Sequence, residues 1–171
     1  MGDGKSGSAE ERRFADASLV LRQFLAAPGG DRPRVHVIGP VRHVARYNQA
    51  FRRVQTGERE DIARLKAGLD VTGFLMVVDD QHLTHALRQH GNPMAEAGRG
   101  QLAVNRDDYG CLVRIVGNPD NVMDSESGSR GGPRVVVSKV IGRVRYKVVL
   151  EARVRRTHIA FLTMFKSWDV Q

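Results

Sequence analysis

The most regular pattern in the chain is the alternation of apolar and polar residues between Arg143 and Val154. Even-numbered positions from Val144 to Val154 are apolar or aromatic, whereas most odd-numbered positions from Arg143 to Arg153 are charged. A two-residue period is typical of a strand with one buried and one solvated face. Apolar runs predict further strands over Arg34–Ile38, Phe74–Val78, Val135–Ile141 and Ile159–Phe165. The last run is apolar on both parities, so we expect it in the middle of the sheet.

Apolar residues at three- and four-residue spacing predict the helices. They mark Glu10–Ala27, a stretch from Val41 to Leu69 broken near Thr56–Gly57, a short helix over His82–His90 ended by Gly91, and Asp107–Val116 with Asp107 or Asp108 as N-cap. The last three strands follow one another through short connections and form a meander. Helices first and an antiparallel sheet last predict an α+β domain.

Glycine, serine and proline mark the breaks in this pattern. Residues 1–9 are rich in Gly and Ser and are expected to be disordered, and residues 28–33 form a boundary. We therefore expect a disordered start with a helical extension over residues 1–32, and the main domain over 33–171. Residues 124–133 are expected to be a flexible loop.

Charge and cysteine content narrow the function classes. The chain has 171 residues, 41% hydrophobic residues and a net charge of +8, which favours a polyanionic partner, with nucleic acid ahead of a membrane surface. Cys111 is the single cysteine, so no intramolecular disulfide is possible and a cysteine-based zinc site is disfavoured. No apolar window reaches the ~18 residues of a membrane span, and the first residues lack the basic-then-apolar pattern of a signal peptide. We expect a reducing compartment and no membrane partner.

Three of the six histidines lie between Gln81 and Gly91. Histidine is the side chain best suited to move protons near neutral pH. On a helical wheel His85 lies on the polar side and is the predicted free imidazole, whereas His90 lies on the apolar stripe and reaches a substrate only if the helix frays. His82 is expected to be solvated near the helix start. A metal site built on His82 and His85 is a weaker alternative, because the stretch lacks a recognised ligand pattern.

Two polar residues interrupt the apolar runs of the late strands. Lys139 and Thr163 either lie in a cleft, where they would hold and neutralise a phosphate, or are a lysine on a solvated edge and a locally satisfied hydroxyl. The basic residues of the alternating strand either bind an RNA backbone or form an ordinary solvated face; they are Arg143, Arg145, Lys147 and Arg153.

Ordered sequence blocks make the chain similar to a known family. The blocks are Gly68–Gly73, His85–Gly91, Arg99–Gln101, Asp107–Tyr109, Asn118–Val122, the strands with Lys139 and Tyr146, and Leu162–Phe165. Between about Val35 and Phe165 the chain resembles the phage-type members of the barnase–EndoU–colicin–RelE nuclease superfamily. The resemblance implies helices packed on a curved antiparallel sheet. It also implies a metal-independent ribonuclease, typically a toxin or effector domain.

The resemblance further implies site residues and partners. His85, His90, Lys139 and Thr163 would be catalytic, and Arg99 and Tyr146 would bind substrate. We expect His85 to activate a ribose 2′-hydroxyl, His90 to protonate the leaving 5′-oxygen, and a 2′,3′-cyclic phosphate to form without a metal or cofactor. The expected partners are RNA, with tRNA as one candidate, and an immunity or antitoxin protein. The expected site of action is the cytoplasm, reached through a secretion or phage system. The alternatives are an inactive nucleic-acid-binding or phage structural-associated module and a metal-dependent nuclease.

Overall fold

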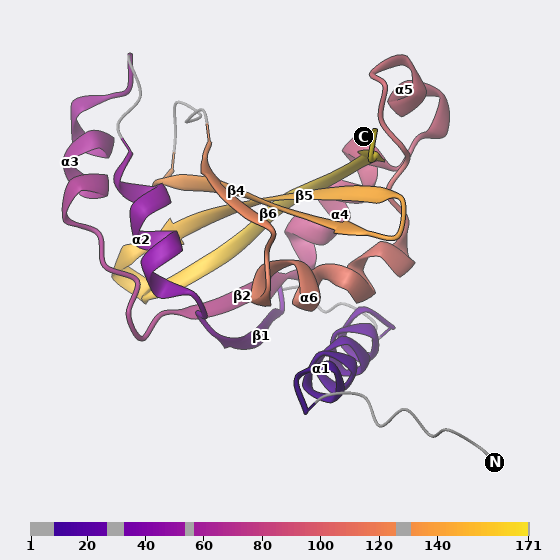
Figure 1. Ribbon diagram of the computed structural model, residues 1–171, viewed down its shortest axis with the longest axis horizontal. Coiled ribbons are helices and arrows are strands. Elements are labelled where there is room, and N and C mark those ends of the chain that lie inside the picture. The colour runs from indigo at the N-terminus through magenta and orange to yellow at the C-terminus, as the bar shows by residue number, and fades with distance from the viewer. Residues whose placement is uncertain (1–8, 27–32, 54–56, 126–130, 171) are drawn as a thin grey trace.

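A six-stranded sheet forms the centre of the computed structural model, which describes residues 9–26, 33–53, 57–125 and 131–170 (Figure 1). The strands are β1 (Val35–Pro40), β2 (Leu75–Asp79), β3 (Asn121–Asp124), β4 (Arg134–Ile141), β5 (Val144–Arg153) and β6 (His158–Trp168). Their order across the sheet is β1-β2-β6-β5-β4-β3, so the last strand lies between two others as predicted. All neighbours are antiparallel except β2 and β6, which are parallel. The α+β class is confirmed, whereas the expectation of a purely antiparallel sheet is wrong at this one pair.

The alternation in β5 separates the two faces of the sheet. Val148 pairs with Val137 of β4 and with Met164 of β6, and all three side chains are buried. A bulge in the β5–β6 ladder places Leu150 opposite Phe161 and Val149 opposite Thr163, so Leu162 is the extra residue. The opposite face, which we call the open face, is half-exposed and carries Arg145, Lys147, Val149, Arg153, Thr163 and Phe165.

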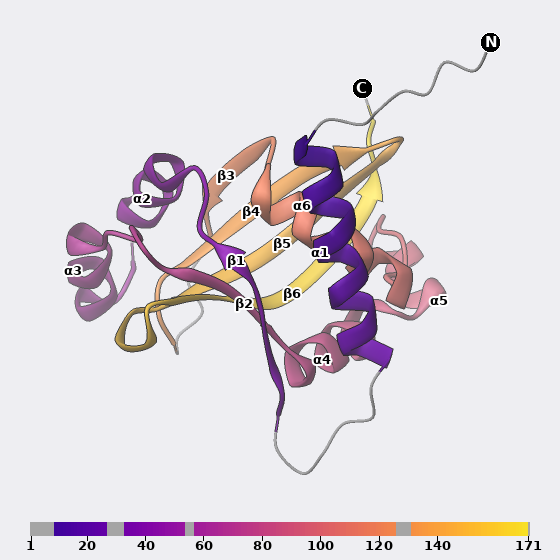
Figure 2. The ribbon, with the colours of Figure 1, turned by 90° about the horizontal axis from the view of Figure 1, so that it is seen from below.

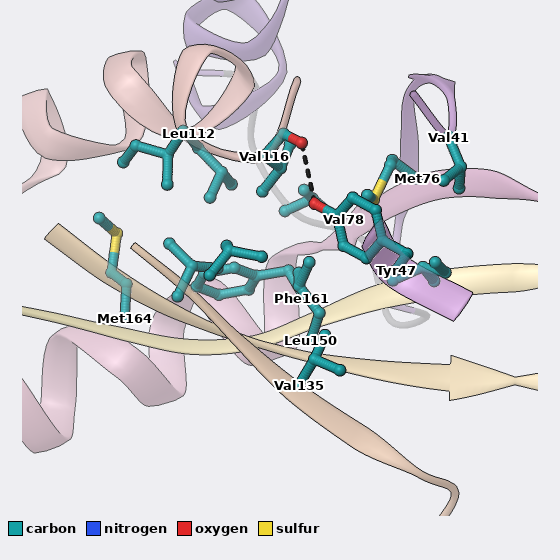
Figure 3. Packing of buried hydrophobic residues seen from close by; sticks show 14 of the residues in the cluster. Val41, Tyr47, Met76, Val78, Leu112, Val116, Val135, Leu150, Phe161 and Met164 are labelled. Atoms are coloured by element: carbon teal, nitrogen blue, oxygen red, sulfur yellow. Dashed lines mark hydrogen bonds between the residues drawn. The ribbon is translucent and has the colours of Figure 1, made fainter. Parts of the chain in front are cut away.

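Helices cover the core face of the sheet. They are α1 (Ala9–Ala26), α2 (Val44–Arg52), the 3-10 helix η1 (Arg106–Cys111) and α6 (Leu112–Gly117), and α3 (Glu60–Gly68) packs beside α2. Figure 2 shows α1 and α6 in front of the sheet. Leu112 and Val116 pack toward Phe161, and the hydroxyl of Tyr47 donates a hydrogen bond to the Val116 carbonyl at 2.9 Å (Figure 3). The N-terminal helix is docked on this core, because Leu21 is fully buried.

The predicted helix over Asp107–Val116 is divided in two and begins earlier. Asn105, not Asp107 or Asp108, is the N-cap: its side chain accepts hydrogen bonds from the backbone N–H groups of both aspartates. Asp108 completes a capping box by accepting from the Asn105 N–H at 2.7 Å. The first turn is therefore a 3-10 helix, and α6 continues from it.

Helix α4 (Asp80–His90) follows β2 directly and packs along β6. The described pairing of β2 with β6 ends at Ala160, and α4 takes the place beside the rest of that strand. A short helix, α5 (Pro93–Gly98), comes next. Strand β3 and helix α5 were not predicted. Residues 1–8 and 28–32, and most of the predicted 124–133 loop, lie outside the described residues.

Candidate functional site

A cleft of about 580 Å³ lies between α4 and the open face of the sheet. Its lining consists of Gln81, His82, His85 and Gln89 from α4, Arg134, Val149, Leu162 and Thr163 from the sheet, and Ser125. Because α4 packs along β6, its polar side meets the open face at this point. Two of the three clustered histidines and the interrupting threonine are therefore brought together.

His82 is held by a carboxylate at the start of α4. Asp79 is buried and is the N-cap of the helix, where its Oδ1 accepts a hydrogen bond from the His82 N–H at 2.7 Å. The same side chain contacts the imidazole, with Nδ1 at 2.8 Å from Oδ1 and 2.7 Å from Oδ2. Since a carboxylate only accepts hydrogen bonds, Nδ1 carries the hydrogen and Nε2 is left for another partner. We expected a merely solvated His82, so this contact was not predicted. The signal in the sequence is Asp79, three residues before the histidine.

His85 lies one turn after His82, and its side chain is exposed at the edge of the cleft. Within the described ranges no hydrogen bond reaches its ring. This environment agrees with the predicted free imidazole, whose two nitrogens remain available to a substrate.

Thr163 contributes a hydroxyl without a partner. Its Oγ1 is buried and forms no hydrogen bond with any residue that the structure describes. A buried hydroxyl without a partner costs free energy, and it lines the same cleft as the two histidines. The alternative of a locally satisfied hydroxyl is therefore not what the structure shows.

His90 belongs to a separate polar network next to the cleft. It remains the last residue of α4, and its Nδ1 lies 3.1 Å from Oε2 of Glu96, which is fully buried in α5. Arg99 donates to the other Glu96 oxygen, and the His90 ring lies 5.9 Å from that of Phe165. The helix end is not frayed here, so His90 and Arg99 are engaged with Glu96 rather than lining the cleft.

Lys139 and Tyr146 point to the core face, opposite Thr163. The two residues pair across β4 and β5, in the same parity as the buried Val137 and Val148. The Lys139 Nζ donates to the carbonyl of Asn118 at 2.7 Å and to Asp120 at 3.1 Å. The structure therefore does not bring Lys139 to the histidines, because the strand register places it on the other side of the sheet.

Tyr146 has an equally internal environment. Its hydroxyl donates to Asp108 at 2.9 Å, and Lys166 reaches the same carboxylate at 2.9 Å. Burial, together with the hydrogen bond to Asp108, raises the pKa of Tyr146 above its ordinary value. This geometry gives Tyr146 a structural role in the core, away from the predicted substrate surface.

Some basic residues of the predicted basic face are close to carboxylates and others are not. Arg143 is exposed in the turn between β4 and β5, and Arg145 is paired with Asp169 at 2.5 Å. Arg153 lies 3.7 Å from Glu151 and 3.8 Å from Asp79. Lys147 lies over the Phe165 ring at 5.8 Å, and no carboxylate of the described chain pairs with it. Lys147 is therefore the clearest cation of the open face near Thr163.

A carboxylate-held imidazole, a free imidazole and an unpartnered hydroxyl therefore lie together in one cleft, and imidazoles are groups that exchange protons near neutral pH. The site is carried by an α+β domain whose sheet ends in a three-strand meander. Residues 53–169 match the family described as phage-Barnase-EndoU-ColicinE5/D-RelE like nuclease3, and the chain belongs to this family. Its membership confirms the expected resemblance and indicates a nuclease. No curated protein and no solved structure matches the chain.

Two kinds of feature are absent from the described part of the chain. None of its helices is both long and apolar enough to span a bilayer. Its His, Cys, Asp and Glu side chains nowhere gather in threes as metal ligands would.

Proposed function

We propose that this protein is a metal-independent endoribonuclease and that the cleft between α4 and the open face is its active site. The observation that carries the proposal is the unpartnered Thr163 hydroxyl in the same cleft as His82 and His85. Two imidazoles can supply both the base and the acid of phosphodiester cleavage, so the reaction needs no further group for proton transfer.

The proposed reaction uses the 2′-hydroxyl of RNA as the nucleophile. His85, whose ring is free, takes the proton of the 2′-hydroxyl while the 2′-oxygen bonds to the adjacent phosphorus. The bond from phosphorus to the 5′-oxygen breaks, and His82, which starts the step protonated on both ring nitrogens, donates the Nε2 proton to that oxygen. The products are a 2′,3′-cyclic phosphate and a 5′-hydroxyl. The Asp79 carboxylate keeps the His82 ring oriented and faces its charge when it is protonated.

The remaining groups of the cleft would act on the phosphate. The Thr163 hydroxyl, which is buried in the free protein, would turn into the cleft by rotation of the side chain and donate to a non-bridging oxygen, where negative charge develops in the transition state. Lys147, on the same face, would bind the RNA backbone in place of Lys139. His90 would be a positioning residue, since its Glu96 contact fixes the end of α4.

The decisive assay incubates the protein with total RNA, with and without EDTA, and maps the ends of the fragments. We expect EDTA-resistant cleavage that leaves cyclic phosphates. His82→Ala and His85→Ala should each lower the rate by about 100- to 10,000-fold while RNA affinity is retained. His43→Asn is the matched control, because it removes a histidine outside the cleft and asparagine tolerates the left-handed backbone of His43 (φ 54°).

Two outcomes would contradict this function. Cleavage that EDTA abolishes would indicate a metal-dependent nuclease. Intact binding without cleavage across a broad panel of RNAs would favour the nucleic-acid-binding or phage structural-associated module.

The biological setting that we propose is that of a toxin or effector acting on cytoplasmic RNA, with tRNA as one candidate target. An enzyme of this kind would need an immunity or antitoxin protein in its producer. Expression of the intact chain should arrest growth, whereas expression of His85→Ala should not; equal growth of the two strains would contradict a toxic role.

A further inference from the structure

A second cavity, of about 660 Å³, lies on the other side of α4, between that helix and α1. Its lining includes Leu25 and Ala26 of α1, Arg88 of α4, and Arg106 of η1. It shares His85 with the cleft described above. His85 therefore lies between two cavities. Arg88 and Arg106 line the second cavity, and His82 and Thr163 line the cleft.

The positive charge of this cavity is not balanced within it. Arg88 and Arg106 are both exposed, and neither has a carboxylate partner in the described part of the chain. Arg34 also lines the cavity, but its side chain binds Asp80, with Nε 3.1 Å from Oδ2. Two guanidinium groups that line one cavity without a carboxylate partner are typical of an anion-binding site. Arginine suits a phosphate in particular, because it donates paired hydrogen bonds to the phosphate oxygens.

One wall of the cavity comes from a part of the chain that precedes the matched family region. That region begins at residue 53, whereas the wall is formed by the end of α1 and by Arg34. Arg34 fastens the wall: its Nη2 donates to the Phe24 carbonyl at 3.1 Å, and its guanidinium lies 4.6 Å from the centre of the Phe24 ring. The cavity is therefore a feature of this chain and its N-terminal helix, rather than of the matched domain by itself.

We propose that this cavity is a phosphate-binding subsite that holds a nucleotide of the RNA chain flanking the one at His85. The inference rests on the proposed ribonuclease function, because the RNA chain would pass from the cleft over His85 into the cavity. Arg88 and Arg106 would contact the flanking phosphate, and the apolar residues of the lining, such as Leu25, would lie under its nucleoside. The N-terminal helix would thus lengthen the binding site along the RNA.

Binding of a single-stranded oligonucleotide that cannot be cleaved tests the subsite separately from catalysis. The probe is a fully 2′-O-methylated RNA, which lacks the nucleophile, and its affinity is measured over a range of salt concentrations. Each phosphate contact on single-stranded nucleic acid contributes about −0.7 to the slope of log K against log salt. We expect Arg88→Ala and Arg106→Ala each to weaken binding several-fold and to make this slope shallower, and Arg88→Lys to keep most of it. Because the probe cannot react, a catalytically dead protein would give the same result.

The matched control is Arg64→Ala. It removes the same charge from the exposed surface of α3, where Arg64 forms a solvent-exposed pair with Glu60, at the other end of the molecule from α1 (Figure 2). If Arg88→Ala and Arg106→Ala change affinity and slope no more than Arg64→Ala does, the subsite is refuted. A second arm titrates adenosine 5′-monophosphate. Binding of the mononucleotide as tightly as of the oligonucleotide, and equally sensitive to Arg88→Ala, would assign the cavity to a free nucleotide and overturn the RNA assignment.

Discussion

Replacing Thr163 with valine should separate stability from activity. Valine has nearly the same shape and the same branching at Cβ, so the side chain keeps its conformation in β6. The exchange removes a hydroxyl whose oxygen is buried and without a partner among the described residues. We expect the variant to be at least as stable as the wild type and strongly impaired in RNA cleavage.

The magnitude follows from the environment of the hydroxyl. An unsatisfied buried polar group costs about 1–3 kcal/mol, and part of this penalty is relieved when a methyl group takes its place. The gain in the free energy of unfolding is therefore about 1 kcal/mol, which raises Tm by roughly 2–4 °C for a chain of this size. Loss of one hydrogen-bond donor to a developing negative charge costs on the order of 100- to 1,000-fold in kcat.

The assays are urea denaturation and the rate of cleavage of a defined RNA oligonucleotide. Thr163→Ser is the control, because it keeps the hydroxyl and loses a methyl group; it should retain activity and lose about 0.8 kcal/mol of stability. If Thr163→Val is destabilised by more than about 1 kcal/mol, the hydroxyl forms a hydrogen bond in the folded protein and is not an unpartnered group. If the valine variant cleaves RNA at the wild-type rate, Thr163 does not act on the phosphate.

Three further variants test the environments of other side chains. Asp79→Asn should keep the cap of α4, since asparagine caps as well as aspartate. It should lower kcat by about tenfold or more, because the amide no longer orients the His82 imidazole as the carboxylate does. An unchanged kcat, measured with the oligonucleotide, would contradict this role. Tyr146→Phe should lower the free energy of unfolding by about 1–2 kcal/mol, because Asp108 loses a buried hydrogen bond. RNA affinity should not change. A loss of RNA affinity without a loss of stability would show that Tyr146 binds the substrate. The pKa of Asp70 is lowered to about 2, chiefly by a hydrogen bond from a backbone N–H group, so its stabilising effect is complete above the ordinary carboxyl pKa and is lost as the pH falls toward 2. The stability difference between the wild type and Asp70→Asn should therefore shrink on acidification, and a pH-independent difference in denaturation curves would refute the assignment.

The fold was predictable from the sequence where the apolar residues follow one clear pattern. The alternation in β5 identified the strand, and the wholly apolar run from Ile159 correctly indicated a central strand. The parallel pairing of β2 with β6 left no local trace, because it joins segments about 80 residues apart in the chain and depends on the tertiary arrangement. Strand β3 has only four residues, too few to show a period.

The residue types of the proposed site were predictable from the sequence, whereas the contacts of these residues were not. The sequence indicated a free imidazole at His85, and the structure places that side chain in the cleft. Lys139 lies in a run that is apolar on both parities, so only the register could show that it faces the core. The environment of His90 depends on α5, a helix that was not predicted although Asn92 and Pro93 are typical of a helix start.

The position of the cleft follows from the point where β2 stops pairing with β6. The chain turns there from a strand into α4, and a turn of this kind needs a residue that caps the new helix. Asp79 provides the cap through the His82 N–H and also contacts the His82 ring. The buried Asp79 carboxylate thus lies at the end of β2, caps α4 and contacts the His82 imidazole, which lines the cleft. Because the cap and this contact share a single side chain, the start of α4 cannot shift without moving the proposed acid, which couples the geometry of the site directly to the topology of the sheet.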